Sequence, residues 1–302
     1  QTLKYFYKQN VDIKIISGDN PLTVSQIAKH AGVKKYDNFI DMTTVSDDEL
    51  ENVALKYFIF ARVSPTQKLE LVKALQRNGK TVAMTGDGVN DVLALKQADC
   101  SVAMANGSDA TKNVSQLILL NSDFSSMPKV VAEGRRTINN IQRSASLFLV
   151  KTIYSCLLAL MSLLMQENYP FVPIQLSLIS FVTIGTPSFL LALEPNKEKI
   201  TGSFLKNILK KALPTGLICA ISIFFLTLLS KFNIIETNKL STLCIISTGF
   251  WGLLLLFSFS KSRKNEESSL PFSIYRLLLA ICMTIIFIFA ITYFSAFFNI
   301  NL

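Results

Sequence analysis

The sequence predicts an α/β domain built on a parallel sheet, followed by an α-helical transmembrane bundle. Two observations predict it. Short apolar runs alternate with helical patterns in the first part of the chain, and later runs are long enough to cross a bilayer. Charge divides the chain in the same way: residues 1–146 contain 18 Lys or Arg and 15 Asp or Glu, against 12 and 6 in residues 147–302.

Composition argues against an ordinary soluble domain, a nucleic-acid-binding protein and a fold held by zinc or disulfides. The 302 residues are 50% hydrophobic and 17% charged, with a mean hydropathy of +0.39, whereas soluble domains carry about 25% charged residues. The net charge of +9 is concentrated beside the apolar runs, as membrane orientation requires, so it does not indicate nucleic-acid binding. Five scattered Cys without a C-x-x-C pair indicate neither a zinc site nor a disulfide framework.

The first part predicts alternating strands and helices. Helices are expected from Pro21 to Gly32, from Ser46 with Glu49 as its capping partner, from Ser64 to Gly79, and from Asn90 to Gln97. The expected strands are 11–16, 57–61, 81–85, 100–105 and 116–120. This alternation predicts one parallel sheet with helices on both faces. Its active site is expected beyond the carboxyl ends of the strands, where two Gly-Asp turns lie.

The second part predicts a long helix over 127–165 that is first basic and then apolar, as in a stalk that enters a membrane. Further spans are expected at 172–193, 212–230, 240–260 and 274–298. The loops 194–211 and 261–273 carry five and three basic residues (Lys261, Arg263 and Lys264 in the second), and the loop 166–171 carries none. Residues 1–146 are therefore expected on the cytoplasmic side.

Thr85-Gly86-Asp87-Gly88-Val89-Asn90-Asp91 directly follows an expected strand and opens a helix. Two carboxylates and an amide one turn apart, beside glycine backbone at a helix start, suit Mg²⁺ and phosphate together. An acidic first turn that only stabilises the helix dipole is the alternative.

Two further segments complete a candidate phosphoryl-transfer site. Ser17-Gly18-Asp19-Asn20 offers a hydroxyl and backbone N–H groups at another strand end, or a simple helix cap. Lys68 lies one turn into a helix and can bind a phosphoryl oxygen, or be merely solvated. A hydroxyl, a cation and a metal-binding carboxylate are the parts that phosphoryl transfer uses.

The segments SGDN, ARVSPTQK and TGDGVNDVLALKQADCSVAMANGSDATK (85–112) resemble the C-terminal half of the phosphorylation domain of P-type cation-transporting ATPases. The resemblance implies a haloacid-dehalogenase-like fold for residues 1–126, and equates the five spans with the family's fifth to ninth helices. It implies ATP and Mg²⁺ as cofactors. It implies catalytic roles for Ser17, Lys68 and Asp87, phosphate or nucleotide loops at Ser17, Gly18, Asp19, Gly86, Gly88 and Asn90, and a magnesium site at Asp87, Asn90 and Asp91.

The family's nucleophile, an Asp in a D-K-T-G-T motif, does not occur in the sequence. We therefore expect a C-terminal fragment of an ATP-driven pump of the bacterial plasma membrane, unable to form the aspartyl-phosphate alone. Two alternatives stay open: a membrane-anchored phosphatase of the same fold, and a non-catalytic membrane regulator that binds nucleotide or Mg²⁺.

The transported ion is first expected to be calcium, although Ile184 stands where calcium pumps carry an Asp, and a lipid- or polyamine-transporting subgroup stays open. Lys151 is a charge inside a span, and acts either as an internal counter-cation or gate, or by snorkelling to the interface. Pro187 is expected to kink or unwind its span, and an unwound span exposes carbonyls to an ion; a tolerated membrane proline is the alternative. The candidate ion-site residues are Lys151, Thr152, Ser155, Ser180, Thr183 and Thr186.

Overall fold

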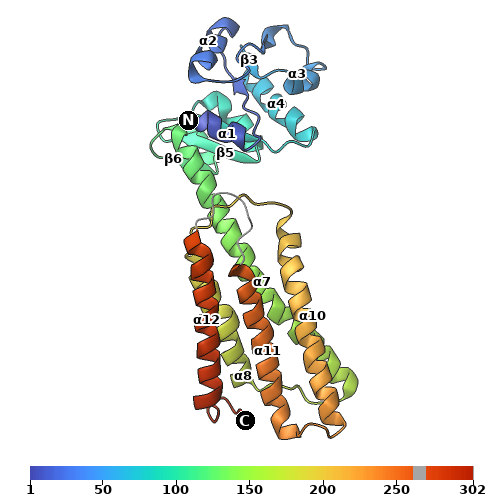
Figure 1. Ribbon diagram of the computed structural model, residues 1–302. Helices are drawn as coiled ribbons and strands as arrows, with labels where there is room; N and C mark the ends of the chain where they lie inside the picture. Colours follow the sequence, from blue (N-terminus) through green and yellow to red (C-terminus); the bar gives the residue numbers. More distant parts are fainter. Residues whose placement is uncertain (261–269, 302) are drawn as a thin grey trace. The chain divides into compact units, whose positions relative to one another are not determined.

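The computed structural model describes residues 1–260 and 270–301. It divides the chain into two compact units, Gln1–Val131 and Ala132–Leu302. Figure 1 colours the elements of the first unit from blue to green, and those of the second from green to red. The predicted basic residues Lys261, Arg263 and Lys264 lie outside the described residues.

The first unit contains two parallel sheets of three strands each. Their strand orders are β1-β3-β2 and β4-β5-β6. The bounds are β1 Ile15–Ile16, β2 Phe39–Asp41, β3 Ile59–Ala61, β4 Ala83–Gly86, β5 Cys100–Met104 and β6 Leu117–Leu119. The parallel pairing is confirmed, but the expectation of one continuous sheet is not met, because no strand within residues 1–131 pairs with both β1 and β4.

Helices follow most of these strands. Their bounds are α1 Thr2–Lys8, α2 Pro21–Ala31, α3 Leu50–Lys56, α4 Pro65–Arg77, α5 Val92–Gln97 and α6 Asp109–Val114, with short 3₁₀ turns at Met42–Thr44, Val89–Asp91 and Phe124–Ser126. The helix starts read from the sequence have identifiable caps. Asn20 accepts a hydrogen bond from Leu22 N (3.0 Å), and Ser64 and Gln67 form a reciprocal capping box.

Three elements of this unit were not expected from the sequence, namely α1, β2 and α6. Each has seven residues or fewer, so hydrophobic periodicity has too little length to reveal it. The expected helix at Ser46 begins four residues later, at Leu50. Ser46 instead donates its hydroxyl to Glu49 Oε2 (2.9 Å) in the turn before that helix.

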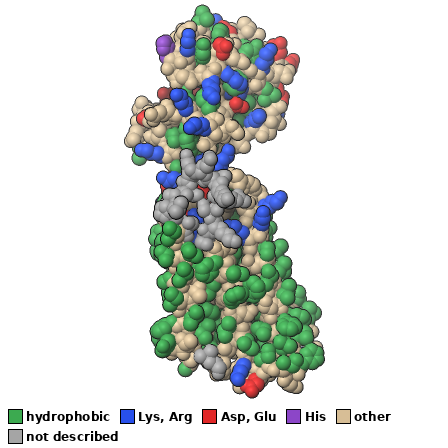
Figure 2. Space-filling model, in the orientation of Figure 1, with side chains coloured by type: hydrophobic (Ala, Val, Ile, Leu, Met, Phe, Trp, Pro, Cys, Tyr) green, Lys and Arg blue, Asp and Glu red, His purple; other side chains and the backbone are tan. Residues whose placement is uncertain are grey.

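The second unit contains the long apolar helices. Five helical segments are long and apolar enough to cross a membrane, so the predicted number of spans is confirmed for the described residues. The helices are α7 Met127–Met165, α8 Pro173–Ser180, α9 Thr186–Ala192, α10 Phe204–Lys231, α11 Thr237–Ser260 and α12 Leu270–Tyr293. In Figure 1, α10, α11 and α12 run side by side, and Figure 2 shows hydrophobic side chains over the outside of the bundle.

The second span is interrupted. A π-helical turn, Phe181–Gly185, separates α8 from α9, and Pro187 is the second residue of α9. Because proline has no N–H to donate to the preceding turn, the regular hydrogen-bond ladder changes there. The sequence placed an interruption at this proline, and the structure contains a π turn instead of an unwound segment.

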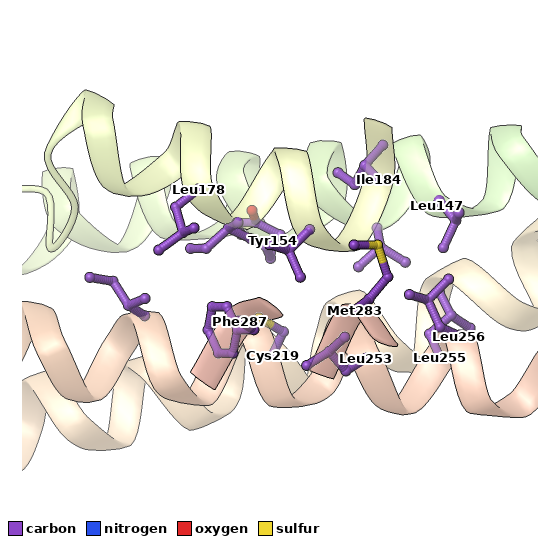
Figure 3. Packing of buried hydrophobic residues seen from close by; sticks show 14 of the residues in the cluster. Leu147, Tyr154, Leu178, Ile184, Cys219, Leu253, Leu255, Leu256, Met283 and Phe287 are labelled. Atoms are coloured by element: carbon purple, nitrogen blue, oxygen red, sulfur yellow. The ribbon is translucent and has the colours of Figure 1, made fainter. Parts of the chain in front are cut away.

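The bundle is closely packed around a shared apolar core. Figure 3 shows Tyr154 of α7, Cys219 of α10 and Phe287 of α12 among its buried side chains. Glycines allow the helices to pack at short distance. A Cβ on Gly252 would lie 2.7 Å from Thr183 Cγ2, and one on Gly216 would lie 2.7 Å from Ile153 Cγ2. Such close contacts are typical of membrane helices that associate through small residues.

Candidate functional site

The predicted phosphoryl-transfer residues lie in segments that follow three parallel strands. Ser17 follows β1, Lys68 lies in the first turn of α4 after β3, and Asp87 follows β4. All three therefore lie at carboxyl ends of strands, which is where open α/β sheets bind their ligands.

Lys68 and Asp91 join the two sheets. Lys68 Nζ lies 2.7 Å from Asp91 Oδ1, and the two side chains are 13% and 11% exposed. Asp91 Oδ2 accepts a hydrogen bond from the N–H of Gly88 (3.3 Å). Both oxygens of Asp91 are thus engaged, so its carboxylate holds Lys68 beside the glycine turn.

The Asp87 turn is fixed by the loop that follows β5. The carbonyl oxygen of Asp87 accepts a hydrogen bond from Ser108 N (2.8 Å). Gly107 comes so close that a Cβ there would lie 2.9 Å from Asp87 O, and a Cβ on Gly86 would lie 2.7 Å from Asp91 Cβ. Glycine is therefore required on both sides of this turn, while Asp87 and Asn90 remain exposed.

The Ser17 loop is held by its own hydrogen bonds and by the end of β3. Asp19 N donates to Ser17 Oγ (3.2 Å), and Val63 N donates to Ser17 O (3.0 Å), which ties the loop to the end of β3. Asn20 caps α2, as the alternative interpretation had it. Gly18 has no atom within 4 Å of where its Cβ would be, so the loop is open to a ligand there.

No group of three or more His, Cys, Asp or Glu within the described ranges is arranged to hold a metal ion. An exposed carboxylate on Asp87 and an amide on Asn90 are nevertheless hard oxygen donors. Nearby, the side-chain hydrogen bond from Lys112 and the charge of its ammonium hold the pKa of Asp109 below its usual range.

The predicted ion-site residues are brought together only in part. Lys151 Nζ donates to Ser180 Oγ (2.7 Å), so the charged α7 residue contacts the end of α8. Thr183 is buried in the π turn, where its hydroxyl donates to Ile179 O (2.7 Å). Thr152 is exposed and bonds within its own helix. Ser155 and Thr186 are half-buried.

Lys151 and Thr183 line one small cavity in the bundle. Its volume of about 10 Å³ is enclosed by residues of α7, the π turn, α10 and α11, including Tyr154 and Thr248. The Tyr154 hydroxyl is buried and has no hydrogen-bond partner among the described residues. A cavity of this size has room for about one water molecule or a small ion.

A buried ionic cluster in the second unit was not predicted. Glu194 is 4% exposed, and its carboxylate pairs with Arg143 Nη1 (2.6 Å) and with Arg276, whose Nε lies 2.9 Å from both oxygens. Asn140 donates to the carbonyls of Ala192 and Glu194 (2.9 and 3.0 Å). An acidic residue directly at the end of an apolar span was the available signal.

The chain is similar to known proteins over both its parts. A sequence family described as haloacid dehalogenase-like hydrolase matches residues 1–99. The probable cation-transporting ATPase exp7 of Streptococcus pneumoniae is 41% identical over 289 residues, which cover 93% of this chain and 36% of that protein.

Two other relatives carry calcium in their names. The calcium-transporting ATPase CtpE of Mycobacterium tuberculosis is 44% identical over 234 residues, 74% of this chain and 29% of that protein. The calcium-transporting ATPase CtpE of Mycolicibacterium smegmatis is 36% identical over 304 residues, which cover 95% of this chain and 37% of that protein. This chain thus spans about a third of the length of the relatives it matches.

Proposed function

This chain belongs to the P-type cation-transporting ATPases, and from that premise we propose that it carries part of the machinery of an ATP-driven cation pump. We assign residues 1–126 to the phosphorylation domain, 127–165 to a stalk that continues into the first span, and 172–193, 212–230, 240–260 and 274–298 to the remaining spans. The observation that carries the proposal is the junction of Lys68, Asp91 and the Asp87 turn at the carboxyl ends of the strands.

ATP is the proposed phosphoryl donor. Lys68 binds a phosphoryl oxygen, and Asp91 keeps its ammonium in position. The Ser17 hydroxyl and Gly18 provide the remaining contacts to the phosphate, with Asp19 in the nucleotide loop and with Gly86 and Gly88 in the turn that carries Asp87. Because Asp91 already holds the Lys68 ammonium in place, this group needs little reorganisation when charge develops on the phosphoryl group.

Mg²⁺ is the proposed cofactor, and the donor set fits it. Mg²⁺ retains several waters and takes one or two carboxylates plus phosphate oxygens, and Asp87 and Asn90 are exposed hard donors. Bound there, it offsets negative charge on the phosphoryl oxygens. Direct ligation by Asp91 stays a prediction, since in this conformation Asp91 Oδ1 faces Lys68 and Oδ2 faces Gly88 N.

The proposed cargo is a cation, with calcium first because two relatives are named calcium-transporting. Lys151, Ser180 and Thr183 surround the proposed passage, with Thr152, Ser155 and Thr186 as further candidates. The proposed location is the bacterial plasma membrane, with residues 1–146 in the cytoplasm, because the basic loops and the first unit share one side.

The test uses the complete protein encoded by the reading frame that contains this chain, in membrane vesicles. Incubation with radiolabelled ATP and Mg²⁺ is expected to yield an acid-stable phosphoprotein, whose formation a transported cation stimulates. Asp87→Asn is expected to abolish that label. Asp109→Asn is the matched control, because this carboxylate is exposed and pairs with Lys112 in its own helix turn, and it is expected to retain the label.

Two outcomes contradict the proposal. Undiminished labelling in Asp87→Asn would remove Asp87 from the metal site. Steady hydrolysis of ATP with no phosphoprotein and no cation dependence would favour the membrane-anchored phosphatase instead.

A further inference from the structure

The second unit contains a polar cavity that the proposed pump function does not use. It measures about 440 Å³ and lies among α7, α10, α11, α12 and the segment 196–201. This volume is within the usual range for small-molecule sites. All of its lining residues belong to the second unit.

The cavity is strongly basic. Among the described residues, Arg143, Lys199, Lys210, Lys211 and Arg276 line it, against one acidic residue, Glu198. Glu194 lies behind the two arginines and neutralises part of their charge. The remaining positive charge favours an anionic ligand.

Two buried groups in the lining have N–H donors without an acceptor among the described residues. Arg143 is 8% exposed, and among the described residues its guanidinium bonds through Nη1 to Glu194, although the group carries five N–H donors. Gln142 Nε2 is buried and has no hydrogen-bond partner in the described part of the chain. Buried donors without acceptors are costly, so the cavity is suited to a ligand with several oxygens.

The cavity lies where the apolar surfaces of the spans begin. Arg276 is the third residue of the apolar span Ile274–Tyr293. Lys210 and Lys211 directly precede the apolar run 212–230, and Arg143 lies one turn before Leu147 of the bundle core. This is the depth of lipid headgroups, and basic pockets between helices at that depth bind anionic headgroups.

We propose that this cavity binds the phosphodiester headgroup of an anionic phospholipid such as phosphatidylglycerol. The phosphate oxygens accept from Arg143 and Gln142, with Lys199 and Lys210 at the opening, and the acyl chains lie along the apolar helices. Arginine at the base of the site fits, because its planar fork matches two phosphate oxygens.

The test measures lipid selectivity of the chain in phosphatidylcholine vesicles with trace spin-labelled phosphatidylglycerol or phosphatidylcholine. The motionally restricted spectral fraction is expected to favour phosphatidylglycerol. Lys199→Gln with Lys210→Gln is expected to reduce that preference about tenfold. The matched control is Lys197→Gln with Lys206→Gln, which removes the same charge from the same segment and helix at exposed positions outside the lining, and it is expected to retain the preference.

The variant Lys199→Arg with Lys210→Arg keeps the charge and is expected to keep the preference. The variant Lys199→Gln with Lys210→Gln is expected to unfold like the unsubstituted chain in lipid-free detergent, which distinguishes lost lipid binding from a folding defect. An equal loss in both pairs, or no preference in the unsubstituted chain, would overturn the proposal. Displacement of the labelled lipid by added inorganic phosphate would also overturn it, by identifying a free-phosphate site.

Discussion

Lys68 Nζ and Asp91 Oδ1 lie 2.7 Å apart, and this ion pair links the helix after β3 to the turn after β4. Lys68 lies in α4 and Asp91 in the 3₁₀ turn Val89–Asp91, and the strands β3 and β4 that precede them belong to different sheets. Their contact therefore holds the carboxyl ends of β3 and β4, where the candidate catalytic residues lie, next to each other.

Lys68→Met is expected to destabilise the first unit by about 3 kcal/mol, because it leaves the largely buried Asp91 carboxylate without its counter-charge. Adding Asp91→Asn should recover part of that loss, since the amide oxygen can still accept from Gly88 N. Urea unfolding followed by circular dichroism measures both. Lys73→Met, which breaks an exposed pair on the same helix, should cost about 0.5 kcal/mol or less; a similar cost for Lys68→Met would refute a buried-pair role.

Gly107→Ala is expected to destabilise the Asp87 turn by about 1–3 kcal/mol, because the added methyl meets Asp87 O at 2.9 Å. A shift of the unfolding midpoint reports it. Gly18→Ala is the control, since no atom lies within 4 Å of its Cβ position. Equal effects of the two substitutions would mean that the close approach of the two loops is not what requires glycine.

Glu194→Gln is expected to cost at least about 3 kcal/mol, because two buried guanidinium groups lose their carboxylate. Arg143→Met should cost less, since Glu194 keeps its contacts with Arg276. Thermal unfolding in detergent should give this order, with the exposed Glu198→Gln nearly neutral. If Arg143→Met destabilised the chain more than Glu194→Gln, the contact with Arg276 alone would not be enough to hold Glu194.

Burial lowers the pKa of Lys14 from 10.5 to about 8, with Lys35 and Lys80 adding repulsion and Asp12 opposing it. The unfolded chain therefore holds a proton that the folded chain has lost between these pKa values, so stability should rise with pH from about 8 to 10.5. Lys14→Met should raise stability at pH 7 and flatten that rise.

The check is to measure unfolding midpoints of Lys14→Met between pH 7 and 10.5. The control is Lys4→Met, which replaces an exposed lysine of α1. If both variants kept the same rise with pH as the unsubstituted chain, Lys14 would not be its source.

Local signals in the sequence found the membrane spans and the two Gly-Asp turns. Apolar length alone decides whether a helix can cross a bilayer, and Asp87 follows a strand that periodicity reveals. The strand β1 was expected over 11–16 but has only two residues, and the three-residue strand β2 was not expected, because both depend on pairing with β3.

By itself, the sequence determined the α/β-then-membrane organisation, the loops with Ser17, Lys68 and Asp87, and the likeness to P-type pumps. Only the tertiary structure decided that Asp91 pairs with Lys68, that Lys151 contacts Ser180, and that Glu194 joins Arg143 to Arg276. The partners in these pairs lie 23 to 82 residues apart. Periodicity and motifs report neighbours along the chain, whereas contacts at such separations exist only once helices and strands have packed.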